Sequence, residues 1–182
     1  GAIIDPGAAS GLIGSDTLKE MQDGNVISDI TWSSEVTSVT GIAGEPDRTV
    51  GLVTFTTQLG PIAATFSADV IGGSGSKCPF LLSNPSLRRN NASLISNFFS
   101  DGDALLVFMT DGTRHLYRAL LTDSGHYMLP FDKEFHGELT GNTSTLVCNF
   151  LASVTQQATS QWNDIAENNH THPTELRQCE LD

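Results

Sequence analysis

The stretch Gly1-Ala-Ile-Ile-Asp5-Pro6-Gly7-Ala8 decides the fold, because an apolar run there delivers one carboxylate into a turn of small residues. Residues 2–4 predict a short buried strand, and the Pro-Gly turn signal ends this strand immediately after Asp5. A charge at the end of an apolar strand is costly unless something satisfies or uses it. Asp5 is therefore a candidate catalytic residue. The alternative interpretation is that Asp5 only caps a turn or the helix that follows.

The length and composition of the chain limit the number of domains and the kinds of partner that it can have. The chain has 182 residues and is 38% hydrophobic, which suits one domain of common size followed by a tail. Nine basic residues against 21 acidic ones give a net charge of −12, which argues against nucleic acid or an anionic membrane as the main partner. No apolar run approaches the roughly 18 residues that a membrane span requires.

The cysteines indicate neither a disulfide framework nor a metal site. Cys78, Cys148 and Cys179 are odd in number and widely spaced, so a reducing, cytoplasmic location is the simpler expectation. His170-Thr-His172 followed by Cys179 lacks the usual set of zinc ligands, and we expect no metal and no other cofactor. The neighbours Ser124 and His126 lack the Gly-x-Ser-x-Gly turn of a serine hydrolase.

The rest of the chain predicts short strands joined by tight turns. We expect a helix over residues 15–21 and another over 85–89, capped by Asn84 with proline at its first position. Two glycines surround one apolar residue in Gly41-Ile42-Ala43-Gly44, which predicts a hairpin tip that can approach another backbone closely, or an ordinary hairpin turn. Strands are predicted over residues 36–39, 50–59, 61–71, 78–83, 93–99, 104–109 and 114–121. From about residue 132 the sequence is polar, with one possible amphipathic helix over 147–165.

Taken in order, these motifs resemble the retropepsin-type aspartic protease domain of retrotransposon polyproteins. Ile3-Ile4-Asp5-Pro6-Gly7-Ala8 is similar to the apolar strand that leads into Asp-Thr/Ser-Gly-Ala in that family. Gly41-Ile42-Ala43-Gly44 is similar to the glycine-rich flap tip. Leu81-Leu82-Ser83 is similar to a second apolar-apolar-Gly turn that opens a helix. The resemblance covers residues 1–131.

The resemblance implies an all-β, closed, barrel-like fold with one or two short helices over residues 1–131, followed by a tail over 132–182 that is partly helical or disordered. It also implies a homodimer, in which two copies of Asp5 meet at the two-fold axis and share one proton. One carboxylate would activate water, while the protonated partner donates to the scissile carbonyl of a polyprotein substrate. Gly7 and Ala8 would form the active-site turn with Pro6, and residues 41–44 would close over an extended peptide.

The sequence departs from the family pattern at four positions. Pro6 replaces a Thr or Ser whose hydroxyl normally bonds across the dimer. Ser83 stands where the second motif usually has Gly, and Ala9 and Asn84 replace an Asp–Arg pair. Two alternatives therefore stay open: a catalytically inactive retropepsin-like module that dimerises or binds peptides, and a generic β-rich interaction domain in which Asp5 caps a turn.

Overall fold

The computed structural model describes residues 1–40, 46–73, 75–110, 112–132, 134–136 and 139. The chain divides into two compact units, Gly1–Thr140 and Gly141–Asp182, and the first extends past the expected boundary at residue 131. The second unit lies outside the described residues, as do the helix expected over 147–165 and the residues His170, His172 and Cys179. The expected flap tip, Gly41, Ile42, Ala43 and Gly44, also lies outside them.

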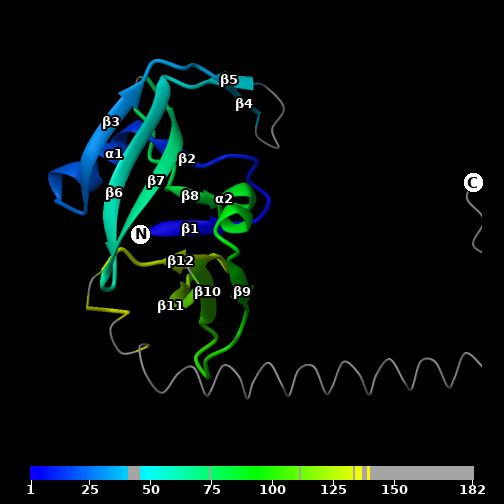
Figure 1. Ribbon diagram of the computed structural model, residues 1–182. Coiled ribbons are helices and arrows are strands. Elements are labelled where there is room, and N and C mark those ends of the chain that lie inside the picture. The colour runs from blue at the N-terminus through cyan, green and yellow to red at the C-terminus, as the bar shows by residue number, and fades with distance from the viewer. Residues whose placement is uncertain (41–45, 74, 111, 133, 137–138, 140–182) are drawn as a thin grey trace, which may run out of the picture. The chain divides into compact units, whose positions relative to one another are not determined.

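The described part of the first unit is mostly β structure with two short helices, which confirms the expected all-β class (Figure 1). The strands are β1 (Ala2–Asp5), β2 (Leu12–Gly14), β3 (Ile27–Ser33), β4 (Ser38–Thr40), β5 (Pro46–Arg48), β6 (Gly51–Leu59), β7 (Ile62–Ile71), β8 (Leu81–Ser83), β9 (Ser93–Ile95), β10 (Ala104–Thr110), β11 (Thr113–Leu121) and β12 (Tyr127–Leu129). The helices are α1 (Ser15–Asp23) and α2 (Asn84–Arg89).

Ten of the described strands form one sheet in the order β3-β6-β7-β2-β8-β1-β12-β11-β10-β9. The expectation of a closed barrel is wrong for this part of the chain, because β3 and β9 are edge strands that do not pair with each other. Most residues of β3 are exposed, as is common in an edge strand. At the centre of the sheet, β2 and β8 have only three residues each. Strands of this length are too short to continue the hydrogen-bonded ladder around a barrel.

The centre of the sheet brings distant parts of the chain together. β8 inserts between β1 and β2, parallel to β1 and antiparallel to β2. On its other side β1 pairs with β12 in an antiparallel ladder, so the N-terminal strand is covered on both edges. Each of β2 and β8 leads directly into a helix, α1 and α2 respectively. Both turns from strand to helix therefore lie near the middle of the sheet (Figure 1).

The core is filled by apolar residues of the sheet and a cluster of phenylalanines. Phe55 and Phe80 are fully buried, with ring centroids 5.3 Å apart in an edge-to-face arrangement. Phe66 and Phe131 are only partly buried and stack on each other at 5.4 Å beside this pair. The alternation of buried and less buried residues along β6, which the sequence predicts, places Val53 and Phe55 toward this core.

Several elements differ from the sequence expectations, among them the short strands β2 and β5, where no strand was expected. Strand β3 was not anticipated, because its polar, mostly exposed residues carry no strong β pattern and a register shift interrupts its pairing with β6. The strand expected over 93–99 ends at Ile95, since Asn97 has a φ of 54°, a left-handed conformation that ends an extended strand. The cap of α2 is Ser83 rather than Asn84, while proline does lie in the first turn.

Candidate active-site turn

Asp5 is the last residue of β1 and lies in a hydrogen-bonded turn. The Ala8 N–H donates to the Asp5 backbone oxygen at 3.1 Å, which places Pro6 and Gly7 at the two central positions of the turn. The Gly7 N–H donates to Asp5 Oδ1 at 2.9 Å. This bond holds the carboxylate against its own turn, while the side chain stays partly exposed. Within the described ranges no cation pairs with Asp5.

Gly7 is favoured by space rather than by backbone conformation. A Cβ atom at this position would lie 3.2 Å from Asp5 Oδ1, closer than ordinary side-chain contacts. Gly7 is not among the residues with positive φ, and proline before it fits the first central position of a type I turn. The sequence argument that a small residue lets the backbone approach the carboxylate therefore agrees with this geometry.

The second expected motif lies beside the first, although 77 positions separate Asp5 from its neighbour Ser83. In the parallel ladder Ile3 pairs with Leu81 and Ile4 with Leu82, so Asp5 and Ser83 end the two strands together. Ser83 is completely buried, and its Oγ lies 3.2 Å from that of Ser86 in the first turns of α2. The turn that carries the carboxylate thus rests on a buried strand end that has no charge of its own.

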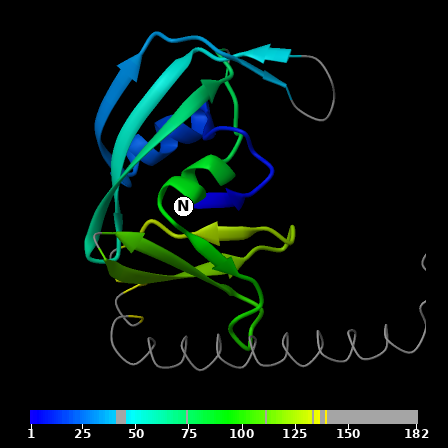
Figure 2. The same ribbon diagram turned by 45° about the vertical axis from the view of Figure 1, so that its right-hand side comes forward.

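A two-stranded arm made of β4 and β5 projects on the side of the unit where the chain leaves Asp5 (Figures 1 and 2). At the base of the arm, the Thr49 N–H donates to the Thr37 oxygen at 3.0 Å, and the Thr37 N–H donates to Thr49 Oγ1 at 2.8 Å. The segment between these two strands contains residues 41–44. We therefore find the arm at the place in the sequence where a flap is expected, with its tip outside the described residues.

One buried carboxylate ties the arm to the loop that follows Asp5. Asp69 on β7 is 8% exposed, and its two oxygens accept hydrogen bonds from Ser10 Oγ and Thr37 Oγ1, each at 3.0 Å. Its backbone N–H also donates to the Gly11 oxygen at 2.9 Å. The Asp69 carboxylate therefore fixes the loop after Asp5 and the base of the arm relative to each other.

Sequence reasoning overlooked Asp69, although a signal was present. This aspartate is the only charged residue in the apolar stretch 61–71, where an unsatisfied charge would be costly. That cost predicts nearby hydrogen-bond donors. Nothing in the sequence says that the donors come from residues 10 and 37, because this depends on how β2 and the arm pack against β7.

The structure gives less support to a serine hydrolase pair or a metal site. Ser124 Oγ lies 3.1 Å from His126 Nδ1, but both residues are exposed in the turn before β12. In the part of the chain that the structure describes, no carboxylate hydrogen-bonds to this histidine to orient it. No group of three or more metal-ligating side chains gathers within the same residues. None of the described helices is long and apolar enough to cross a membrane.

Comparison with models of known protein families finds no match, and comparison with curated protein sequences finds no relative of this chain.

Proposed function

We propose that the chain is an aspartic endopeptidase that acts as a homodimer and cleaves peptide bonds of a polyprotein. The observation that carries the proposal is the register of β1 and β8, which pairs Asp5 with Ser83. The sequence resemblance matches these two segments to two motifs of the family, the strand that leads into the catalytic aspartate and the later apolar turn that opens a helix. Their adjacency in the fold is independent of the resemblance, because turns so far apart in sequence have no local reason to meet.

In the proposed mechanism each chain supplies one carboxylate. Asp5 is partly exposed at a strand end, so a two-fold axis beside it would bring two such groups together. Two carboxylates at close range share one proton, because both cannot readily carry a charge. The ionised member removes a proton from water, and the water oxygen attacks the scissile carbonyl while the protonated member donates to the carbonyl oxygen. The C–N bond then breaks as the first carboxyl passes its new proton to the leaving amine nitrogen and the second carboxylate takes back the proton of the hydroxyl, which restores the starting state of the pair. The Gly7 N–H keeps one oxygen of Asp5 oriented during this exchange.

The arm would hold the substrate. An extended peptide that lies between the Asp5 turn and the arm can form backbone hydrogen bonds of the strand-addition type. The Asp69 bonds to Ser10 and Thr37 support this role, because they fix the base of the arm relative to the catalytic turn. A cytoplasmic, reducing location is part of the proposal and rests on the odd number and wide spacing of the cysteines.

The experiment compares the full chain with its Asp5→Asn variant. Each is incubated with a mixture of denatured proteins, with and without pepstatin, and new peptide ends are identified by mass spectrometry. The matched control is Glu20→Gln, which neutralises an exposed carboxylate on α1. We expect cleavage by the unchanged chain and the control, and loss of at least about a hundredfold in Asp5→Asn, the scale on which general acid–base groups act.

Cleavage that survives in Asp5→Asn would refute the proposal. A chain that sedimentation shows to be a folded dimer, and that cleaves nothing, would also refute it and favour the catalytically inactive dimerisation or peptide-binding module. A folded dimer without cleavage would draw attention to Pro6, because its side chain offers no hydroxyl to the partner subunit.

A further inference from the structure

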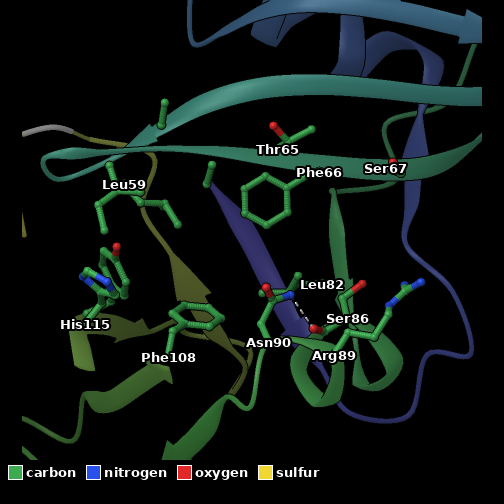
Figure 3. A pocket seen from close by; sticks show the side chains of 14 residues that line it. Leu59, Thr65, Phe66, Ser67, Leu82, Ser86, Arg89, Asn90, Phe108 and His115 are labelled. Carbon is green, nitrogen blue, oxygen red and sulfur yellow. Dashed lines mark hydrogen bonds between the residues drawn. The ribbon is translucent and has the colours of Figure 1, made fainter. Parts of the chain in front are cut away.

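A pocket of about 530 Å³ opens along one edge of β7, and Asp5 is not among the residues that line it. Six consecutive residues of this strand, 62–67, line the pocket. Successive side chains of a strand point to opposite faces, so a pocket that both sets line must run along the edge of the strand. Phe66 and Phe108 form its apolar walls, and Arg89 and Asn90 lie on the rim (Figure 3).

The backbone of β7 is unpaired along this edge. The N–H of Asp69 donates to Gly11, which places the backbone groups of this residue on the side of β2. The oxygen of Val70 accepts from Val50, on the opposite side, next to β6. Because these directions alternate in a regular strand, the backbone N–H groups of Ala63, Thr65 and Ser67 point toward the pocket edge.

No strand among the described residues pairs with this edge. β2 pairs only with Asp69–Ile71, and the ladder with β6 occupies the other edge of β7 without a register shift. Ala63, Thr65 and Ser67 are all exposed. A row of free N–H and C=O groups of this kind is a template for one more strand.

The pocket beneath the edge would receive side chains of the added strand. Phe66 and Phe108 line the pocket and are only partly buried where they pack against the core, so an apolar group in the pocket would complete their burial. Phe108 lies edge-on to Tyr117, with ring centroids 5.5 Å apart, which leaves the aromatic wall fixed before a ligand arrives. The pocket thus favours one large apolar side chain at the centre of the peptide.

Arg89 at the pocket rim favours an acidic peptide. Figure 3 shows His115 at one end of the pocket and Arg89 at the other. Arg89 is exposed, and no carboxylate of the described residues pairs with it. In a chain of net charge −12, an unpaired cation beside an apolar pocket is complementary to a carboxylate of the ligand.

We infer that the open edge of β7 is a docking site for an extended segment of another polypeptide, which adds as a strand and carries a large apolar residue near an acidic one. Backbone hydrogen bonds would supply affinity, and the pocket and Arg89 would supply sequence preference. Six residues of β7 match a partner segment of about six residues, a common strand length. The inference does not depend on peptidase activity, because neither Asp5 nor the arm lines this pocket.

The test selects binders from a displayed library of random peptides and measures their affinity by fluorescence polarisation. Thr65→Pro removes an N–H that points to the open edge, and proline is tolerated in strands where the N–H is not used in the ladder. Thr65→Val is the matched control, since it changes the side chain and keeps the N–H. We expect selected peptides to lose at least about tenfold in affinity for Thr65→Pro, and to bind Thr65→Val as they bind the unchanged chain.

A second pair of variants tests the charge. Arg89→Glu should weaken the selected peptides by about tenfold, whereas Arg88→Glu, its neighbour on α2 that does not line the pocket, should change affinity less than about twofold. This pair keeps the inference testable if circular dichroism shows that Thr65→Pro is unfolded.

Three results would overturn the inference. Peptides that bind Thr65→Pro as tightly as the unchanged chain would show that the edge is not their site. Self-association in sedimentation that Thr65→Pro abolishes would identify a second copy of this chain as the occupant. A library that enriches no binder above background would show that the edge does not accept a strand from another polypeptide.

Discussion

Replacement of Asp69 by alanine should destabilise the first unit by about 2 kcal/mol. The carboxylate accepts two hydroxyl hydrogen bonds at 3.0 Å, and each bond to a charged group contributes about 1.5–3 kcal/mol, which sets a ceiling of about 6 kcal/mol. The net loss is smaller for two reasons. Ser10 and Thr37 are exposed and regain water, and the substitution removes a charge that is only 8% exposed and costly to bury.

The assay is urea denaturation of the full chain, followed by far-ultraviolet circular dichroism. Ser67→Ala is the matched control, because Ser67 lies on the same strand as Asp69. Its hydroxyl pairs at 2.8 Å with that of Thr54 on β6, but this pair is exposed and neutral. We expect the control to change the free energy of unfolding by no more than about 0.5 kcal/mol. The loss of unfolding free energy in Asp69→Asn should lie between the losses in Asp69→Ala and Ser67→Ala, since an amide can still bond to both hydroxyls without a charge.

A loss in Asp69→Ala that does not exceed the loss in Ser67→Ala would refute the reasoning. It would mean that the cost of burying the carboxylate cancels its two hydrogen bonds, and that Asp69 does not hold the arm to the loop after Asp5. A second readout separates local from global effects. Hydrogen exchange at the Thr37 and Thr49 amides should become faster in Asp69→Ala and stay unchanged in Ser67→Ala, because only the first variant releases the base of the arm.

Three further predictions concern the core and two titratable groups. Phe80→Ala should lower the free energy of unfolding by about 4 kcal/mol in the same urea assay, because the Phe80 ring is 1% exposed and packs on Phe55 and Phe66. A loss under about 2 kcal/mol would contradict this packing. Burial lowers the pKa of His136, which faces Tyr117, the Pro130 oxygen and Asp132. The unfolded chain therefore binds more protons, so stability should fall as pH drops below about 6.5, and a pH series on His136→Leu should lack this decline. Burial raises the pKa of the Cys78 thiol, so this thiol should be alkylated more slowly in the folded chain than in urea. Mass spectrometry of samples alkylated at about pH 8 measures the two rates, and equal rates would contradict the burial.

Local sequence signals predicted the elements that surround the candidate site. The apolar run that ends at Asp5 forms β1, and the longer alternating run 50–59 coincides with β6 except at its first residue. The apolar pattern of each segment lies within a few neighbouring residues, so the local sequence is sufficient to predict a strand there. The same holds for the proline in the first turn of α2, because its fixed φ suits that position.

Pairing across the chain could not be predicted in this way. The insertion of β8 between β1 and β2 depends on strands of three residues, which carry too little pattern to define a partner. The open sheet follows from the polar character of β3, an edge strand that the sequence pattern does not reveal. The unpaired edge of β7 is a property of its neighbours, because β2 ends its pairing at Asp69 and leaves residues 62–67 without a partner there.

Pro6 illustrates how the fold changes the interpretation of an unusual residue. Proline lacks an N–H, and in the active-site turn this would matter if that group held the carboxylate or closed the turn. Neither is the case, because Gly7 donates to the Asp5 carboxylate and Ala8 donates to the Asp5 backbone oxygen. Pro6 therefore costs no hydrogen bond within its own chain, and its fixed φ favours the turn that presents Asp5. By resemblance to the protease family, what it removes is a hydroxyl that normally bonds across the dimer, so we expect any effect of Pro6 on the proposed peptidase in dimer formation and not in the geometry of the carboxylate.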